Sequence, residues 1–182
     1  MLGWGMKRLP VFTLLAIGLG TSQSIAFDPG AVERLKSKPV CADCDLSGAS
    51  MEDVYLPGAI LTNANLTGAN LKGANLGFSN LKGAKLSGAN LSGVNLENAD
   101  MSGDDMSNAN LSNTKMHGAN LSGALLTGAN LSDASLSSVK LSGANLQGAN
   151  FTGALNLTSE SLVGAKFCKT TMPDGRVDNS GC

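Results

Sequence analysis

A five-residue period governs the middle of this chain. From Leu46 to Phe151, every fifth residue is Leu, Met or Phe, at twenty-two successive positions. This period matches neither the 3.6-residue repeat of an α-helix nor the two-residue alternation of a β-strand. A fixed period sustained over so many copies predicts stacked units of one kind, that is, a repeat solenoid.

The other positions of each unit keep the same rhythm. The residue two before the apolar centre is Ala in fifteen units, and Asn is the commonest residue directly before the centre. Ser or Thr usually follows the centre, and the next residue is Gly, Asn or Asp in twenty units. Residues two apart in an extended segment point to the same side, so the Ala and the centre fill one interior. Gly, Asn and Asp tolerate the positive φ of a tight turn.

These preferences predict an all-β solenoid. A strand of about two or three residues followed by a turn makes a corner, and four corners close a square coil in which residues twenty apart stack. Twenty-two units correspond to about five and a half coils, or a rod roughly 26 Å long at the spacing between β-strands. Side chains then fill the interior, so we expect no internal pocket.

The pattern resembles the pentapeptide-repeat family, whose unit reads A(N/D)LXX, and the resemblance covers residues 44–154 almost continuously. It implies a right-handed quadrilateral β-helix with four units per coil. We expect a short N-terminal helix and a C-terminal loop or short helix to cap the two ends, because an exposed core and unpaired strand edges need covering. The predicted organisation is a signal peptide at 1–26, a helical cap at 27–43, the solenoid at 44–154 and a cap at 155–182.

The first 26 residues are typical of a secretory leader. Lys7 and Arg8 precede an apolar run at 11–19, and Ser24-Ile25-Ala26 matches a cleavage signature. The run is too short to span a bilayer, so we expect no stable membrane anchor after cleavage. The alternative is an N-terminal membrane anchor. Export would place the four cysteines in an oxidising compartment.

The two ends of the solenoid carry their own signals. Asp28-Pro29 is typical of a helix start, and Pro39 stops a helix, so we expect a helix over 28–38 with Val32 and Leu35 facing the first coil. After residue 154 the register slips by one, and 158–161 lacks the repeat, which fits a short helical turn or a bulged coil. The sequence at 172–175 predicts a turn within a closing loop over 168–182.

The cysteines form two pairs at opposite ends of the rod. A disulfide needs Cα atoms within about 7 Å, so the rod permits only Cys41–Cys44 and Cys168–Cys182. Two other readings are a thiol-redox pair at Cys41 and Cys44, and a zinc site. The redox reading lacks the βαβ context typical of such motifs, and the only His, His117, is far from both pairs.

A few positions depart from the repeat. Asp104 is the one charged residue at an inward position, between Ala84 and Ala124 in the stack. It is either a functional carboxylate with Asp105 beside it, or a distorted or water-satisfied corner. Phe78 occupies a turn position where Gly is usual, and Leu125 points outward, so both are possible contact residues.

Tyr55 and Ile60 also point outward, and with Leu125 they are candidates for a contact patch, although single exposed apolar residues are normal. His117 is expected to be a solvated surface residue, and five asparagines twenty apart are expected to form a ladder on one face. These asparagines are Asn70, Asn90, Asn110, Asn130 and Asn150.

Charge argues against nucleic-acid binding. Without Lys7 and Arg8 the chain has 11 basic and 14 acidic residues, a net charge of −3 with no basic cluster. No catalytic constellation, phosphate loop or cofactor motif is recognisable. We therefore expect no enzyme and no cofactor, but a structural or protein-interaction module that is a monomer or weak oligomer with an unknown protein partner.

The resemblance is to exported pentapeptide-repeat proteins of cyanobacteria and their relatives in the chloroplast thylakoid lumen. The leader, the Cys-Ala-Asp-Cys-Asp-Leu entry at 41–46 and the Phe-Cys-Lys-Thr-Thr-Met-Pro-Asp-Gly exit at 167–175 carry it. It implies a location in the periplasm or lumen. An alternative is a DNA-mimicking, gyrase-interacting protein of the same family, which the leader, the weak net charge and the interspersed lysines oppose.

Overall fold

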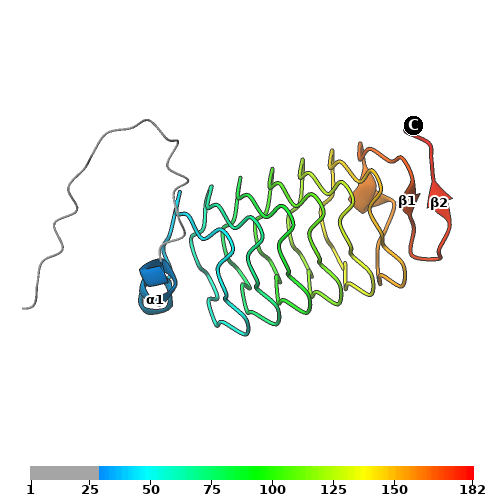
Figure 1. Cartoon of the computed structure of the whole chain (residues 1–182). Helices are drawn as coiled ribbons and strands as arrows, with labels where there is room; N and C mark the ends of the chain where they lie inside the picture. Colours follow the sequence, from blue (N-terminus) through cyan, green and yellow to red (C-terminus); the bar gives the residue numbers. More distant parts are fainter. Residues whose placement is uncertain (1–28) are drawn as a thin grey trace, which may run out of the picture.

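The computed structural model describes residues 29–182. The predicted leader at 1–26 and the predicted helix cap Asp28 lie outside the described residues. Helix α1, Pro29–Ser37, is followed by the solenoid, the short 3-10 helix η1, Glu160–Leu162, and the strands β1, Thr170–Thr171, and β2, Val177–Asp178. Figure 1 shows the coils stacked between α1 at one end and β1 and β2 at the other.

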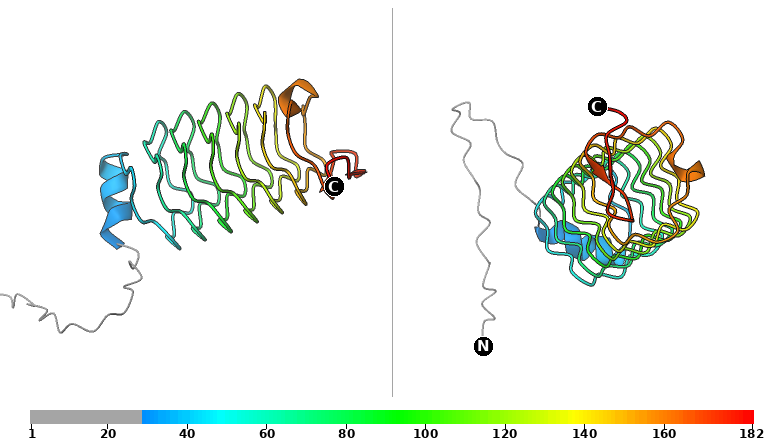
Figure 2. Two further views of the ribbon diagram at one scale, coloured as in Figure 1. Left: turned by 90° about the horizontal axis from the view of Figure 1, so that it is seen from above. Right: turned by 90° about the vertical axis from the view of Figure 1, so that its right-hand side faces the viewer.

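Parallel pairing between residues twenty apart builds the coils. It runs from Val40–Ile60 to Ser135–Leu155, so four five-residue units complete each coil. Viewed down the rod, the coils superimpose as a four-sided outline (Figure 2). The paired segments are single residues rather than the two or three expected, because a two-residue turn and an inward Ala occupy the rest of each unit.

The unit at 64–68 shows why this short segment is stable, since all five backbone amides have acceptors. Leu66 N–H donates to Lys85 O at 2.7 Å and Gly68 N–H to Ser87 O at 3.0 Å, both one coil onward. Asn65 N–H donates to Cys44 O one coil back, and Ala64 N–H closes the preceding turn on Leu61 O. Thr67 N–H donates to the side-chain oxygen of Asn65 at 3.3 Å.

That last bond gives a reason for the Asn that precedes many of the centres. Its side-chain oxygen accepts the amide two residues later, as it does at Asn75, Asn95 and Asn145. Without it, this amide is the one N–H of the unit with no acceptor in the backbone ladder. The sequence pattern alone suggested only that Asn points outward.

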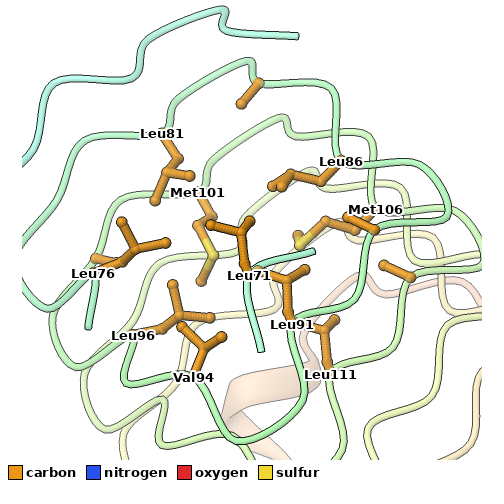
Figure 3. Packing of buried hydrophobic residues seen from close by; sticks show 14 of the residues in the cluster. Leu71, Leu76, Leu81, Leu86, Leu91, Val94, Leu96, Met101, Met106 and Leu111 are labelled. Atoms are coloured by element: carbon orange, nitrogen blue, oxygen red, sulfur yellow. The ribbon is translucent and has the colours of Figure 1, made fainter. Parts of the chain in front are cut away.

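The core consists of the two inward positions of each unit. All twenty-two apolar centres are at most 3 % exposed, and the Ala positions are buried with them. Figure 3 shows leucines and methionines of successive coils, such as Leu71, Leu91 and Leu111, stacked along the rod axis. Stacking like on like keeps the interior filled, so burial of Leu against Leu stabilises every coil in the same way.

The turn residue two after each centre has positive φ throughout, as the Gly, Asn and Asp pattern predicted. Two of the twenty-two are neither Gly, Asn nor Asp: Phe78, with φ of 60°, and Ser138, with φ of 56°. A bulky residue in the left-handed region costs about 1–2 kcal/mol. The ring of Phe78 recovers little of this by burial, because the residue is 70 % exposed.

Helix α1 lies across the first coil, as Figure 1 shows, with Val32 and Leu35 buried against the core. Val40 N–H donates to Lys38 O where the chain leaves the helix, and Ile60 N–H donates to Pro39 O. The chain therefore enters the ladder directly after the helix.

The change of register predicted after residue 154 is an insertion of one residue. The parallel pairing between neighbouring coils continues beyond it. Asn145 pairs with Lys166 and Asn150 with Thr171, each twenty-one residues apart. Helix η1 lies within the inserted stretch. β1 and β2 then form an antiparallel hairpin over the end of the rod, so the segment predicted as a closing loop contains a small sheet. Thr170 is fully buried, and its hydroxyl donates to Leu146 O at 2.7 Å.

Phe78→Gly should stabilise the fold. We expect the free energy of unfolding to rise by about 1 kcal/mol, because Gly relieves the left-handed strain and the exposed ring loses few contacts. The reverse change one coil back, Gly58→Phe, has open space at φ of +68° and should destabilise by a similar amount. Denaturant unfolding in dilute solution measures both; equal stabilities for Phe78→Gly and the unmodified chain would contradict the strain argument.

Candidate functional site

The rod presents four outward faces, each a column of residues one coil apart. We name them by one member. The Asn face comprises Ser50, Asn70, Asn90, Asn110, Asn130, Asn150 and Thr171; the Tyr55 face Tyr55, Asn75, Asn95, Lys115, Ser135 and Leu155; the Ile60 face Val40, Ile60, Asn80, Asp100, Asn120 and Lys140; the Leu125 face Asp45, Asn65, Lys85, Asp105, Leu125, Asn145 and Lys166.

The five asparagines form the predicted ladder on the Asn face. Four of the five side-chain amides donate to the side-chain oxygen one coil back, at 3.1 Å from Asn90 to Asn70 and at 3.3 Å from Asn130 to Asn110, and Asn70 is the first acceptor of the ladder. The same oxygens also accept backbone amides of their own turns. Because these side-chain oxygens already accept hydrogen bonds within the rod, they do not form a cluster of free acceptors on the surface. The ladder therefore stabilises the stack and does not form a ligand site.

Charges on the faces alternate in sign and do not build a field of one sign. On the Leu125 face, Asp45 and Asp105 are separated by Lys85. At a corner, Lys72 Nζ lies 3.3 Å from a carboxylate oxygen of Glu52. A surface that imitates a nucleic acid duplex needs a continuous negative stripe, and these columns do not provide one.

Asp104 is completely buried in the inward column. One carboxyl oxygen, Oδ1, accepts the backbone amide of Ala84 one coil back at 3.0 Å, and the other, Oδ2, is buried without a hydrogen-bond partner. The backbone around it keeps the regular ladder, since Asp105 N–H still donates to Ala84 O at 3.0 Å. The distorted corner considered from the sequence is therefore not present.

Burial raises the pKa of the Asp104 carboxyl from its ordinary 3.8 to about 8. Backbone hydrogen bonds from Ala84 and Gly83 offset part of this shift, and the neighbouring Asp100 carboxylate adds to it. Asp105 follows in the chain but belongs to the Leu125 face, so the two carboxyls do not point into one site. Asp104 has no access to solvent or substrate and is a structural feature of the core.

The polar residues that replace Ala elsewhere are satisfied locally. The hydroxyl of Ser79 donates to Leu76 O, and that of Thr114 donates to Leu111 O at 2.8 Å. Both side chains reach back three residues along their own turn. A carboxylate cannot do this, because it lacks a proton to donate until it is neutral.

The predicted contact residues are all exposed, but they do not converge. Tyr55 is 73 % and Leu125 44 % exposed, on different faces, and Phe78 lies at the corner between the Tyr55 and Ile60 faces. His117 lies on that same corner two coils further on.

Sequence reasoning missed an open hollow of about 250 Å³ farther along, lined by Ser138, Val139, Lys140, Ser142, Thr158, Glu160 and Ser161. The one-residue insertion that forms it left only a broken repeat as its signal.

Both expected cysteine pairings are present as disulfides. Cys41 joins Cys44 between α1 and the first coil, with Cα atoms 5.3 Å apart, and Cys168 joins Cys182 across the hairpin, with Cα atoms 4.8 Å apart. Cys41 is buried, which hinders attack by an external thiolate on its sulfur. Within residues 29–182, no group of three or more His, Cys, Asp or Glu side chains is placed to hold a metal ion.

A family model for pentapeptide repeats matches this chain. Its copies align with residues 41–77, 64–103, 79–118, 105–143, 114–153 and 129–174. These matches include the inserted stretch and the first strand of the hairpin, in agreement with the continued pairing there. A comparison with curated proteins gave no match.

Solved structures with likeness to the chain are pentapeptide repeat proteins. Rfr23 from the cyanobacterium Cyanothece 51142 is 29 % identical over 80 % of this chain and 98 % of its own, with a TM-score of 0.50. HetL, involved in heterocyst differentiation regulation in Nostoc sp. strain PCC 7120, is 34 % identical over 76 % of this chain and 66 % of its own, with a TM-score of 0.34. The chain thus spans just under two thirds of HetL.

A third likeness is to a pentapeptide repeat protein of the Arabidopsis thaliana thylakoid lumen. It is 24 % identical over 69 % of this chain and 86 % of its own, with a TM-score of 0.23. Within the described part of the chain, no helix is long and apolar enough to cross a bilayer.

Asp104→Ala should remove a pH dependence of stability. In the folded state the carboxyl stays neutral up to about pH 8, whereas in the unfolded state it ionises above pH 3.8. Its contribution to the free energy of unfolding therefore falls as pH rises between these values, by about 1.4 kcal/mol per pH unit. Unfolding measured from pH 4 to 8 should show this slope lost in Asp104→Ala and kept in Asp105→Asn. Equal slopes in both variants would contradict it.

Removing the Cys168–Cys182 disulfide should loosen the hairpin but leave the coils folded. The bond closes a sequence separation of 14, worth about 3 kcal/mol in chain entropy. In the Cys168→Ser/Cys182→Ser variant, amide exchange should speed up over 168–182 and stay unchanged in the central coils. The Cys41→Ser/Cys44→Ser variant, with a separation of only 3, is the comparison. Free thiols in the unfolded, unreduced protein would refute both bonds.

Proposed function

The chain belongs to the pentapeptide-repeat family, and from this premise we propose that it is a non-catalytic protein-interaction module of an exported compartment. The interior supports this reading. Leu and Ala side chains fill it from the first coil to the last. Its buried carboxyl, Asp104, has no path to a substrate, so chemistry would have to occur on the outer surface.

The outer surface supports binding rather than reaction. On three of the four faces, side chains one coil apart hydrogen-bond to each other, as Asn65 does to Asp45 at 3.0 Å, Asn120 to Asp100 at 3.1 Å and Asn90 to Asn70 at 3.1 Å. Side chains held in this way lose little conformational entropy when a partner binds. These bonds between coils are the observation on which the proposal rests.

Two disulfides support the exported location. Each of the four cysteines is paired, and such bonds persist in oxidising compartments such as the periplasm or the thylakoid lumen. The leader expected at 1–26 points the same way, although it lies outside the described residues. We therefore propose that the protein works in an oxidising compartment outside the cytoplasm. There the disulfides at the two ends of the rod stay formed.

Site-specific photocrosslinking in the native compartment tests this proposal. A photoreactive residue is placed at one position per face: Asn110, Lys115, Asn120 and Asp105. We expect irradiation to give a discrete adduct with another protein from one face and none from the others, because a rigid rod presents one binding column to one partner. Mass spectrometry of the adduct identifies the partner.

The four positions act as controls for each other, since all four are outward and at similar heights along the rod. Samples without irradiation give the background. Adducts of equal yield from every face would indicate diffusional encounter, and an absence of any adduct from all four faces would refute the binding role. Recovery of the protein only from the reducing cytoplasm would refute the location.

A further inference from the structure

One face of the rod differs from the other three in where its apolar side chains lie. Within residues 29–182, only the Tyr55 face carries exposed apolar side chains at both ends, Tyr55 at 73 % and Leu155 at 59 %. The Ile60 face has its two apolar residues at one end, the Leu125 face has a single one near the middle, and the Asn face has none. Between Tyr55 and Leu155 the face is polar.

The corner beside this face holds a second irregularity. Phe78 and Ser138, the two turn residues that depart from the Gly, Asn and Asp pattern, both lie on the corner between the Tyr55 and Ile60 faces. Phe78 keeps a strained backbone while 70 % exposed, a combination that costs stability and that folding does not require. Ser138 lines the open hollow of about 250 Å³.

A two-fold axis across the Tyr55 face relates these features. If two antiparallel rods meet face to face, Tyr55 of one lies at the height of Leu155 of the other, Asn75 at that of Ser135, and Asn95 at that of Lys115. The corners then align as well, because a two-fold axis in the contact plane and perpendicular to the rods keeps each corner on its own side. Phe78 comes to the height of Ser138, which forms the edge of the hollow, while the hollow itself extends over the Ile60 face past Lys140.

The charges agree with the same arrangement. On the aligned corner, Glu97 of one copy comes opposite His117 of the second copy. Lys115 of the second copy lies opposite Asn95 of the first, and so next to the same Glu97. On the other edge of the face, Lys72 meets Ser132, and Asp133 meets Gly73. No two like charges are directly opposed along the contact, because Lys115 lies opposite Asn95 and the two Lys115 side chains are offset from each other by one coil. Like charges directly opposed would cost affinity.

We propose that the Tyr55 face binds a second copy of this chain as an antiparallel two-fold dimer, in which Phe78 of each copy packs against Ser138 of the other, at the edge of the hollow. The hollow has several times the volume of a water molecule and is open to one side. One face of a short rod makes a contact below about 1,200 Å², the size of weak and transient interfaces, so we expect a reversible dimer. This goes beyond the proposed function and does not depend on it.

Charge-swap rescue tests the pairing. Sedimentation of protein recovered from the periplasm of an expressing bacterium, from about 1 to 500 µM, gives the dimer dissociation constant. Tyr55→Lys and Leu155→Glu should each raise it by about 10-fold or more, since each change alters two symmetric contacts. Phe78→Ser should do the same. The matched control, Leu125→Lys, removes an exposed apolar residue from another face and should leave it unchanged.

Mixing the two single variants distinguishes this arrangement from any other. One Tyr55→Lys chain and one Leu155→Glu chain regain a Lys–Glu pair and keep one original Tyr–Leu pair, so a heterodimer should reappear at concentrations where each variant alone is monomeric. Far-UV circular dichroism verifies folding of these surface variants. A monomer at all concentrations, a dimer insensitive to the changes, or a failure of the mixture to associate would each overturn the dimer, while leaving partner crosslinking by other faces untouched.

Discussion

The hydrogen-bond ladder between residues twenty apart is the constraint on which the rest of this structure depends. In a unit such as 64–68, two inter-coil bonds onward, one back, one turn bond and one side-chain acceptor satisfy all five backbone amides. This explains which residues each position favours: one able to take positive φ at the turn, a small one where the wall closes in, and Asn where the fifth amide gains an acceptor. The apolar centres fill the space that the ladder encloses.

Departures from the repeat show how firmly the ladder is held. Ser79 and Thr114 replace Ala in the inward column, and each hydroxyl donates to the backbone oxygen three residues earlier. Asp104 also replaces Ala, and its carboxyl accepts a backbone amide one coil back. In all three cases the backbone pairing continues undisturbed. The side chain, rather than the coil, adapts, and for Asp104 the adaptation is a change of protonation state. The core can therefore hold a titratable group without gaining a functional site.

The outward positions, unlike the inward ones, accept many different residues. Because the ladder places the outward residues in fixed columns, a function can be encoded by a few substitutions without changing the fold. Phe78 illustrates this, since its ring adds strain to a turn and recovers almost no burial within its own chain. Three residues that folding does not explain, Tyr55, Phe78 and Leu155, lie along one face and its adjoining corner, and we look for a binding role there first.

The five-residue period by itself determined the solenoid, its twenty-residue stacking, the inward and outward positions and the positive-φ turns, because each is a local consequence of one unit repeated. It also anticipated the separation of the cysteine pairs, and the helix signals at 28–39 anticipated the burial of Val32 and Leu35. Only the tertiary structure decided how the inserted residue after 155 is absorbed, that pairing resumes at Lys166, and that Asp104 has one satisfied and one unsatisfied oxygen. These depend on contacts between coils, where a residue's environment is set by chain twenty positions away rather than by its neighbours in sequence.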